Sequence, residues 1–328
     1  MEEAFYRELA EMISLGPVVV ATVIRTQGSV PRQVGAKLAL GSDGRLLGTI
    51  GGGAGEAKVI AEAQILLQAT DPAGVEVSID LRDSPLGVCG GRMNLWLQRW
   101  QGSLAQARVT QIQQALATGG GTQLITPLDP QRFPYLSSEF QSLSSPQLKV
   151  LRTADATCES FVDPLLPSPT LLIVGAGHCG IPLAQIAHWA GFRIWIQDDR
   201  PEYLTPERFP TAQRLCPQPF SDLIPDLSCL ADLYIALLTR GYSLDCQILR
   251  TLHQAKLSYR YLGMIGSRKR VKTVLQTLAQ EGIPENAFAP LYAPIGLEIH
   301  AETPAEIAIS ITAQLIQTRR ENLLSCQI

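Results

Sequence analysis

The stretch from Thr170 to Asp199 constrains the fold of this chain more than any other part of the sequence. The apolar run LLIVG is typical of a buried parallel strand, and HCGIPLAQIAHWAG predicts a helix with Pro182 in its first turn. A second strand, FRIWIQ, ends at Asp198 and Asp199. The later runs ADLYIALLT and YRYLGMIG are each followed by a helical stretch. Strands that alternate with helices predict a doubly wound parallel sheet.

Three glycines stand between the first strand and its helix in the pattern G-x-G-x-x-G, at Gly175, Gly177 and Gly180. Glycine lets the backbone approach a phosphate, and the N–H groups at a helix N-terminus attract an anion. The acidic pair Asp198 and Asp199 follows the second strand, where such sites place a carboxylate for a ribose hydroxyl. We therefore predict that NAD(P) or another nucleotide binds here. The alternative is a Rossmann-like scaffold that binds no dinucleotide.

Other residues should reach the same edge of the sheet, because ligands of doubly wound sheets lie beyond the carboxyl ends of the strands. His178 lies inside the glycine loop, where it either faces the ligand or fills space. Serine and arginine at a helix start suit an anion, although a basic run is also typical of a solvated surface. The loops after two later strands contain Thr239, Arg240 and Gly241, and Gly266, Ser267 and Arg268.

Helices and strands mix without strict alternation in the first part of the chain, which predicts an α+β domain. A chain of 328 residues is long enough for two domains, at about 100–200 residues each. We predict a smaller N-terminal α+β domain over residues 1–118 and a Rossmann-like domain over residues 169–328. Residues 119–168, rich in glycine, proline and serine, are predicted to form an irregular connecting region with irregular strands.

A second glycine-rich loop, TIGGGAGE, begins a predicted amphipathic helix with Gly51, Gly52 and Gly53. The turn-rich segment RTQGSVPRQVGAK brings three cations into an otherwise acidic protein, namely Arg25, Arg32 and Lys37. Glycine N–H groups and cations together predict a second anion site. The alternative is that these glycines only make tight turns.

Cys89 stands in the loop LGVCGGRM, beside Gly90 and Gly91 and close to Arg92. A thiol near cations and N–H donors has more thiolate character than a buried one. Cys89 is therefore a candidate for a reactive thiol, although most single cysteines are inert.

Composition excludes several classes of function. Hydrophobic residues make up 46% of the chain and charged residues 17%, which is typical of a globular protein. A net charge of −3 argues against non-specific binding of nucleic acid. No apolar run of about 18 residues predicts a membrane span, and the acidic N-terminus does not look like a signal peptide. The seven cysteines lack a CxxC pair and the four histidines are unpaired, which favours reduced cytoplasmic thiols and no metal site.

These motifs together resemble the XdhC/CoxI family, the accessory factors of xanthine dehydrogenase and related molybdenum hydroxylases. The stretches that carry the resemblance run through nearly the whole chain in the family's order. They are ATVIRTQGSVPRQVGAKLAL, GTIGGGAGE, CGGRM, LLIVGAGHCGIPLAQIAHWAGF, DDRPEYLTPERFP, YLGMIGSRKR and APIGLEI followed by ETPAEIAISI.

The resemblance implies a small α+β domain, a Rossmann-like domain and a dimer. It implies a protein that binds the molybdenum cofactor in its molybdopterin form, protects it during sulfuration and delivers it to a hydroxylase. A cysteine desulfurase and the hydroxylase would be its partners. Binding and delivery, rather than turnover, would be its task.

One position departs from the family pattern. The family's glycine loop commonly reads GGGC-x-E or SGGC-x-E, whereas this chain has Ala54 at the cysteine position and retains Glu56. A mechanism that needs a thiol at this point would have to use another residue, for which Cys89 is the candidate. A divergent nucleotide-binding regulatory protein is the main alternative. An NAD(P)-dependent oxidoreductase is a further one, although no Tyr-x-x-x-Lys pair supports it.

Overall fold

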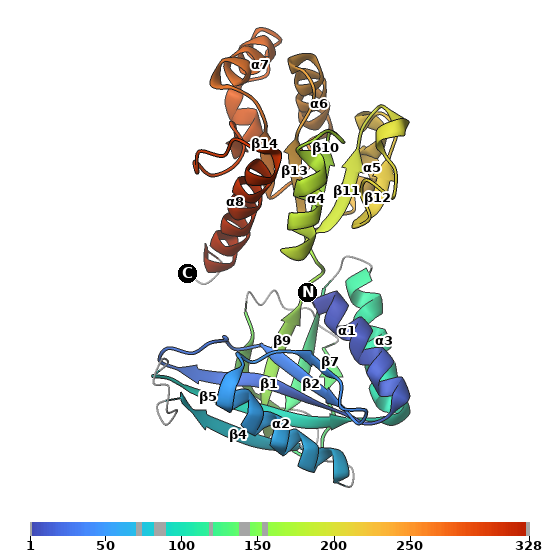
Figure 1. Cartoon of the computed structure of the whole chain (residues 1–328), viewed down its shortest axis with the longest axis vertical. Coiled ribbons are helices and arrows are strands. Elements are labelled where there is room, and N and C mark those ends of the chain that lie inside the picture. Colours follow the sequence, from blue (N-terminus) through green and yellow to red (C-terminus); the bar gives the residue numbers. More distant parts are fainter. Residues whose placement is uncertain are drawn as a thin grey trace. The chain divides into compact units, whose positions relative to one another are not determined.

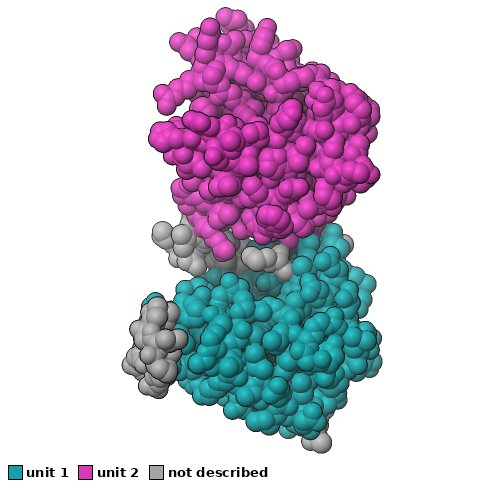
Figure 2. All heavy atoms as spheres, viewed as in Figure 1, with its two compact units in different colours: residues 1–167 teal, residues 168–328 magenta. Residues whose placement is uncertain are grey.

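The computed structural model describes residues 2–69, 74–81, 90–117, 121–137, 145–152 and 157–325. The chain forms two compact units, unit 1 over residues 1–167 and unit 2 over residues 168–328 (Figure 2). Each unit has its own sheets and its own buried apolar clusters. The mixed α/β architecture predicted from the sequence is confirmed.

A five-stranded antiparallel sheet with the order β3-β2-β1-β5-β4 organises unit 1. Alternate residues of its central strand enter two different cores, with Val18 and Val20 in one and Val19 and Ala21 in the other. This double burial explains the continuous apolar sequence of that strand. The strands are β1 (Val18–Gln27), β2 (Lys37–Gly41), β3 (Leu46–Gly48), β4 (Gly74–Asp80) and β5 (Arg92–Trp100).

Helices cover both faces of this sheet. Helices α1 (Glu2–Leu15) and α3 (Gly102–Ala117) pack against each other on one face, and α2 (Gly53–Gln68) covers the other (Figure 1). The helix predicted after the second glycine loop is therefore present as α2.

Residues 119–168 differ from the predicted irregular connection. Their described part forms a four-stranded antiparallel sheet with the order β7-β6-β9-β8, which belongs to unit 1. Leu124 and Leu165 of this sheet are buried in the same cluster as α1 and α3. Prolines inside the strands, Pro127 and Pro164, hide the strand pattern in the sequence. The strands are β6 (Thr122–Pro127), β7 (Tyr135–Leu136), β8 (Gln147–Arg152) and β9 (Thr157–Leu165).

Unit 2 contains the parallel sheet that the sequence predicts. Its order is β12-β11-β10-β13-β14-β15, so the strand order reverses beside β10, the first strand of the unit. Neighbouring strands are parallel throughout. The strands are β10 (Thr170–Val174), β11 (Arg193–Gln197), β12 (Ala212–Cys216), β13 (Leu233–Leu237), β14 (Tyr261–Met264) and β15 (Leu291–Tyr292).

Helices α4 (Gly180–Trp189) and α8 (Pro304–Ser325) lie side by side on one face of this sheet (Figure 1). Helices α5 (Ile224–Ser228), α6 (Tyr242–Ala255) and α7 (Arg268–Gln280) contribute to the core on the other face. A reciprocal capping box begins α8: the Thr303 N–H donates to the Glu306 carboxylate at 2.9 Å and the Glu306 N–H donates to the Thr303 hydroxyl at 3.3 Å. Among the described residues, no helix has the length and apolar character to cross a membrane.

Candidate functional site

A crevice opens at the carboxyl ends of β10, β11 and β13, where the strand order of the unit 2 sheet reverses. Its cavity volume is about 510 Å³. Doubly wound sheets bind their ligands at this place. The crevice gathers most of the residues that the sequence predicts for this edge of the sheet, while Gly180 and Gly241 do not line it. Those that line it are Gly175, Gly177, His178, Asp198, Asp199, Thr239 and Arg240.

The three glycines of the loop after β10 have two different tasks. A Cβ atom at Gly175 would overlap the Leu238 carbonyl oxygen, and a Cβ atom at Gly180 would lie 2.5 Å from the Gly175 carbonyl oxygen. These two glycines therefore allow the backbone to pack closely. A Cβ atom at Gly177 would meet no atom within 4 Å, because this position faces open space. Gly177 leaves room for a ligand rather than for a neighbouring strand.

N–H groups in the same loop are available to a ligand. Among the described residues, no acceptor takes the N–H groups of Gly177 or His178, which precede the first turn of α4. The His178 side chain is exposed and lines the crevice. Free N–H groups just before a helix bind a phosphate or another anion well.

Asp198 holds the glycine loop in place. Its buried carboxylate accepts the Ala176 N–H at 2.9 Å and the Arg200 guanidinium at 2.9 and 3.0 Å. Burial opposes ionisation, but the hydrogen bonds from Arg200 and the Ala176 N–H outweigh it and lower the pKa of Asp198. Because these groups already occupy its carboxylate, Asp198 anchors the loop from inside the protein.

Asp199 faces the crevice and is half-exposed. Its carboxylate forms a bidentate ion pair with Arg240, with N–O distances of 2.7 and 2.8 Å. The hydrogen bonds from Arg240 lower the pKa of Asp199, so this carboxylate is ionised at neutral pH. Of the two predicted ribose partners, Asp199 is the one whose carboxylate remains accessible.

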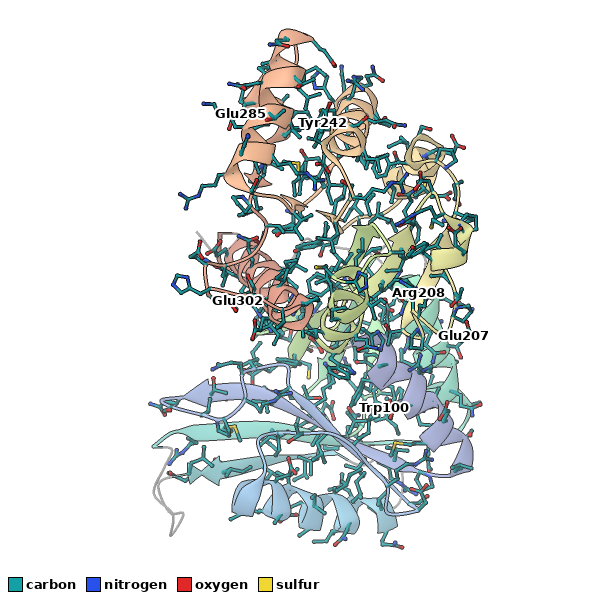
Figure 3. All side chains as sticks on the ribbon, turned by 45° about the horizontal axis from the view of Figure 1, so that its top comes forward. Trp100, Glu207, Arg208, Tyr242, Glu285 and Glu302 are labelled. Carbon is teal, nitrogen blue, oxygen red and sulfur yellow. The ribbon has the colours of Figure 1, made fainter. Side chains whose placement is uncertain are left out.

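Two further arginines stack on one tyrosine beside the crevice. The guanidinium carbons of Arg200 and Arg208 lie 4.0 and 5.0 Å from the centre of the Tyr203 ring. Arg208, labelled in Figure 3, also donates to the Ala176 carbonyl oxygen at 2.9 Å. The loop after β11 thus adds positive charge and an aromatic face to the glycine loop.

The predicted phosphate role of Gly266, Ser267 and Arg268 does not fit the crevice, because none of the three lines it. The Ser267 hydroxyl caps α7 by accepting the Arg270 N–H at 3.3 Å. Arg270 turns inward to the fully buried Asp245, with an N–O distance of 2.6 Å. Ser267 therefore caps α7, and Arg270 fastens α7 to α6.

The second glycine loop, in unit 1, differs from the predicted anion site. The Glu56 carboxylate accepts the N–H groups of Ile50 at 3.0 Å and Gly52 at 3.2 Å, and the Thr49 hydroxyl at 2.7 Å. Desolvation would raise the pKa of Glu56, but these hydrogen bonds outweigh it and lower the pKa. A carboxylate of the chain itself accepts the N–H groups of Ile50 and Gly52, where an external anion was predicted to bind.

The three predicted cations of unit 1 do not converge. Lys37 is buried and lies 2.6 Å from Asp163, so it serves the interior of the unit. Arg25 pairs with Glu159 at 2.5 Å. Arg32 is exposed, and its Cγ lies 3.7 Å from the place where a Gly51 Cβ would stand.

Glycine-rich loops meet at one end of the main sheet of unit 1. A Cβ atom at Gly28 would lie 3.2 Å from the Gly91 Cα and 3.3 Å from the Gly90 carbonyl oxygen. Cys89, the candidate thiol, lies outside the described residues. In the described ranges, no group of three or more His, Cys, Asp or Glu side chains could hold a metal ion.

Comparisons with known proteins place both units in one family. A model of the XdhC and CoxI family matches residues 14–79, and a model of the XdhC Rossmann domain matches residues 171–315. The chain belongs to the XdhC and CoxI family.

Relatives of this XdhC-type chain align over most of its length. A protein of Bacillus subtilis named as a probable subunit of xanthine dehydrogenase is 27% identical over an alignment of 317 residues, and the match covers 92% of this chain and 93% of that protein. The protein YqeB of Escherichia coli is 27% identical over 306 residues, but this chain covers 44% of that longer protein. The crystal structure of a xanthine dehydrogenase from Bacillus halodurans is 26% identical, with a TM-score of 0.77 and 96% of both chains covered.

The position at which this chain departs from the XdhC/CoxI pattern is exposed. Ala54 lies in the first turn of α2, directly after the loop that Glu56 fastens. Its methyl group offers no ligand for a metal or for sulfur. Arg200, Tyr203 and Arg208 were not predicted from the sequence, although their place shortly after the acidic pair is a usable signal for a charged ligand.

Proposed function

We propose that this chain is an accessory factor of a xanthine dehydrogenase-type molybdenum hydroxylase. It binds the molybdenum cofactor as cargo, in the molybdopterin form, protects it while the sulfido ligand is installed, and delivers it to the hydroxylase. Its proposed partners are that hydroxylase, a cysteine desulfurase and a second copy of this chain.

The observation that carries the proposal is the presence of both family units on one chain. That chain aligns over 93% of a relative named as a probable subunit of xanthine dehydrogenase. A protein of this kind needs a place for a large anionic ligand. The crevice of unit 2 offers such a place through the N–H groups of Gly177 and His178.

The phosphate of the cofactor is the group that this crevice can recognise. Arg200 and Arg240 both line the same cavity as the glycine loop. Guanidinium groups bind phosphate oxygens in bidentate fashion, which favours Arg240 as a phosphate partner. Ala54 cannot supply a thiolate, so the proposal assigns any thiol chemistry of this chain to Cys89.

A direct assay tests the proposal. The protein is purified from a molybdenum-replete host and oxidised, and the fluorescent pterin product is quantified. Near-stoichiometric pterin, together with activation of a cofactor-free hydroxylase on mixing, is the expected result. Protein that carries no pterin and fails to activate the hydroxylase would contradict the proposal.

The Gly177→Val variant sharpens this assay, because its side chain would enter the crevice while the fold is retained. Its expected result is loss of pterin. Ala255→Val, a change of similar size at an exposed position of α6, serves as the matched control and should retain pterin.

Two observations favour a second candidate, a nucleotide-binding regulatory protein. The half-exposed Asp199 is placed as a ribose partner, and position 54 carries no thiol. Mass spectrometry of the released ligand separates the two candidates: nucleotide without pterin supports the regulatory protein, and pterin supports the accessory factor.

A further inference from the structure

A groove runs along α7 in unit 2. Helix α7 forms one wall, and the segment from Glu285 of η4 (Glu285–Phe288) to Ala293, directly after β15, contributes the other. The volume of the groove is about 440 Å³. No described residue lines both this groove and the crevice, so the two are separate features of the unit.

Apolar side chains form the floor of the groove. Val271, Leu275 and Ala279 follow one another at intervals of four residues along α7, and Ala293 completes the apolar lining. Leu275 is half-buried and packs against the core of the unit, whereas Ala279 is exposed. Residues four apart on a helix are neighbours on its surface, so these side chains form a continuous strip. The strip offers a contact area to apolar side chains of another molecule.

Cations stand at the first end of the groove. Arg268 and Lys272 line it at positions i and i+4, and Lys269 lies beside them on the same helical turn. All three residues are exposed, and within the described ranges none of their side chains has an ionic or hydrogen-bonding partner. The fourth basic residue of the helix, Arg270, turns inward to Asp245 instead. The unpaired charge of α7 is therefore gathered at this end of the groove.

This arrangement is unfavourable for the helix by itself. Like charges at positions i and i+4 repel each other and lower the stability of a helix. Helix α7 contains no acidic residue that could offset Arg268 and Lys272, although the net charge of the chain is −3. A bound molecule with two carboxylates would supply the partners that the helix lacks.

The second end of the groove has the opposite charge. Glu285, labelled in Figure 3, begins η4, which leads into β15. Because β15 is parallel to β14 and α7 follows β14, η4 lies near the end of α7 rather than near its start. No described residue forms an ion pair with the Glu285 carboxylate. From Arg268 to Ala279 the groove extends about 16 Å along the helix axis.

This pattern selects a peptide over other anionic partners. A nucleic acid would bring phosphates to Glu285 and leave the apolar floor without contacts. A membrane surface would need large exposed apolar side chains, and among the described residues none of these belongs to α7. A peptide can carry carboxylates at one end, apolar side chains in the middle and a cation at the other end.

We propose that the groove along α7 docks an acidic segment of another protein. Two carboxylates of the segment pair with Arg268 and Lys272, and its apolar side chains cover Leu275 and Ala279. A basic residue at the far end of the segment pairs with Glu285. About five residues of extended chain span the groove. This inference goes beyond the proposed function and does not rest on it, because no ligand of the crevice takes part.

Fluorescence anisotropy on the full chain tests the proposal with labelled synthetic peptides. The first peptide carries two glutamates, then leucines, and a lysine at its far end, and the second has glutamines in place of the glutamates. The acidic peptide should bind about 10-fold more tightly than its glutamine counterpart, because only its carboxylates pair with the cations. Its affinity should fall as the ionic strength rises from about 0.01 to about 0.15 M.

Charge reversal ties this binding to the groove. Lys272→Glu should weaken the acidic peptide about 10-fold. The same change should raise the melting temperature of the free chain by about 1–3 °C, because it removes the repulsion from Arg268. Arg320→Glu is the matched control, since it reverses an exposed cation of α8 that has no partner in the described ranges and lies outside the groove. It should leave the affinity for the peptide unchanged.

A charge swap tests the direction of the peptide. A third peptide, with glutamate in place of the terminal lysine, should bind the wild-type chain more weakly because it meets the Glu285 carboxylate. Glu285→Lys should reverse this preference. The same order of affinities in Glu285→Lys as in the wild type would contradict the proposed direction.

Three further results would overturn the proposal. They are failure of the acidic peptide to bind at millimolar concentration and low ionic strength, equal binding by Lys272→Glu and Arg320→Glu, and a lower melting temperature of Lys272→Glu. Tighter binding of an RNA oligomer or of phosphatidylserine vesicles than of the peptide would assign the groove to another class of partner and would also overturn it. Peptide binding by a chain that carries no pterin would leave this proposal standing while the proposed function fails.

Discussion

The Lys37 ammonium lies 2.6 Å from the Asp163 carboxylate inside unit 1, where each side chain is at most 7% exposed. The pair joins β2 to β9, and so connects the main sheet of the unit to the sheet formed after residue 121. Glu2 of α1 approaches the same ammonium at 3.5 Å. One buried cation therefore links both sheets and the first helix.

Removal of Lys37 alone should strongly destabilise unit 1. Lys37→Met leaves the Asp163 carboxylate buried without its cation, which costs about 3–5 kcal/mol. The double variant Lys37→Met/Asp163→Leu should recover much of this loss, because it leaves no unpaired charge. Urea unfolding monitored by tryptophan fluorescence measures both values. Equal stability of the single and double variants would contradict the assignment of Lys37 and Asp163 as a buried ion pair.

Glu56 should contribute to stability in a pH-dependent manner. Its pKa is lowered in the folded state, so its contribution is present above the unfolded value of about 4.3 and is lost as the pH falls through the folded value. Glu56→Ala should be about 0.5–2 kcal/mol less stable than the wild type at pH 7, as expected for a lost helix cap. The difference should shrink below about pH 4. Thermal unfolding at several pH values measures the difference in stability between the wild type and Glu56→Ala. A difference that grows as the pH falls would contradict the role of the ionised Glu56 carboxylate.

Gly175 and Gly177 should respond differently to the same substitution. Gly175→Val forces a side chain against the Leu238 carbonyl oxygen at a φ of 122°, and should lower the melting temperature. Gly177→Val should melt like the wild type but lose its ligand. Differential scanning calorimetry with and without ADP separates the loss of stability from the loss of ligand binding. Equal melting temperatures of the two variants without ADP would contradict the assignment of Gly175 to backbone packing and of Gly177 to ligand binding.

Ala54→Cys tests the departure from the family pattern. A thiol in the first turn of α2 should have a lowered pKa and should alkylate faster with iodoacetamide than an unperturbed cysteine. If the missing thiol limits cargo binding, pterin content should also rise. If the new thiol alkylates fast but the pterin content stays at the wild-type level, binding of the cargo does not depend on a thiol at position 54. Cys89→Ser in the same assay tests the other candidate thiol.

Local patterns were enough to predict the parallel sheet of unit 2, because its buried strands are continuously apolar in the sequence. The second sheet of unit 1 escaped prediction because its strands contain Pro127 and Pro164 and pair across long separations.

The candidate site was also predictable only in part, because contacts between residues far apart in the sequence depend on the order of the strands. Glycines, acids and Arg240 follow strands and were expected at this edge, but the pairing of Arg240 with Asp199 depends on the order of the strands, which the sequence does not show. The role of Glu56 was missed because the sequence does not show whether its carboxylate turns back onto the loop. Positive φ angles of 124° at Gly51 and 76° at Gly52 allow it to do so.

Glu56 has a consequence for how proteins of this kind can change. The carboxylate fastens the loop from within, so the shape of the loop does not depend on the exposed side chain at position 54. A single substitution can therefore add or remove a thiol there while the scaffold stays the same. In this chain the shape of the loop and its reactivity are therefore set by two different residues, Glu56 and the residue at position 54.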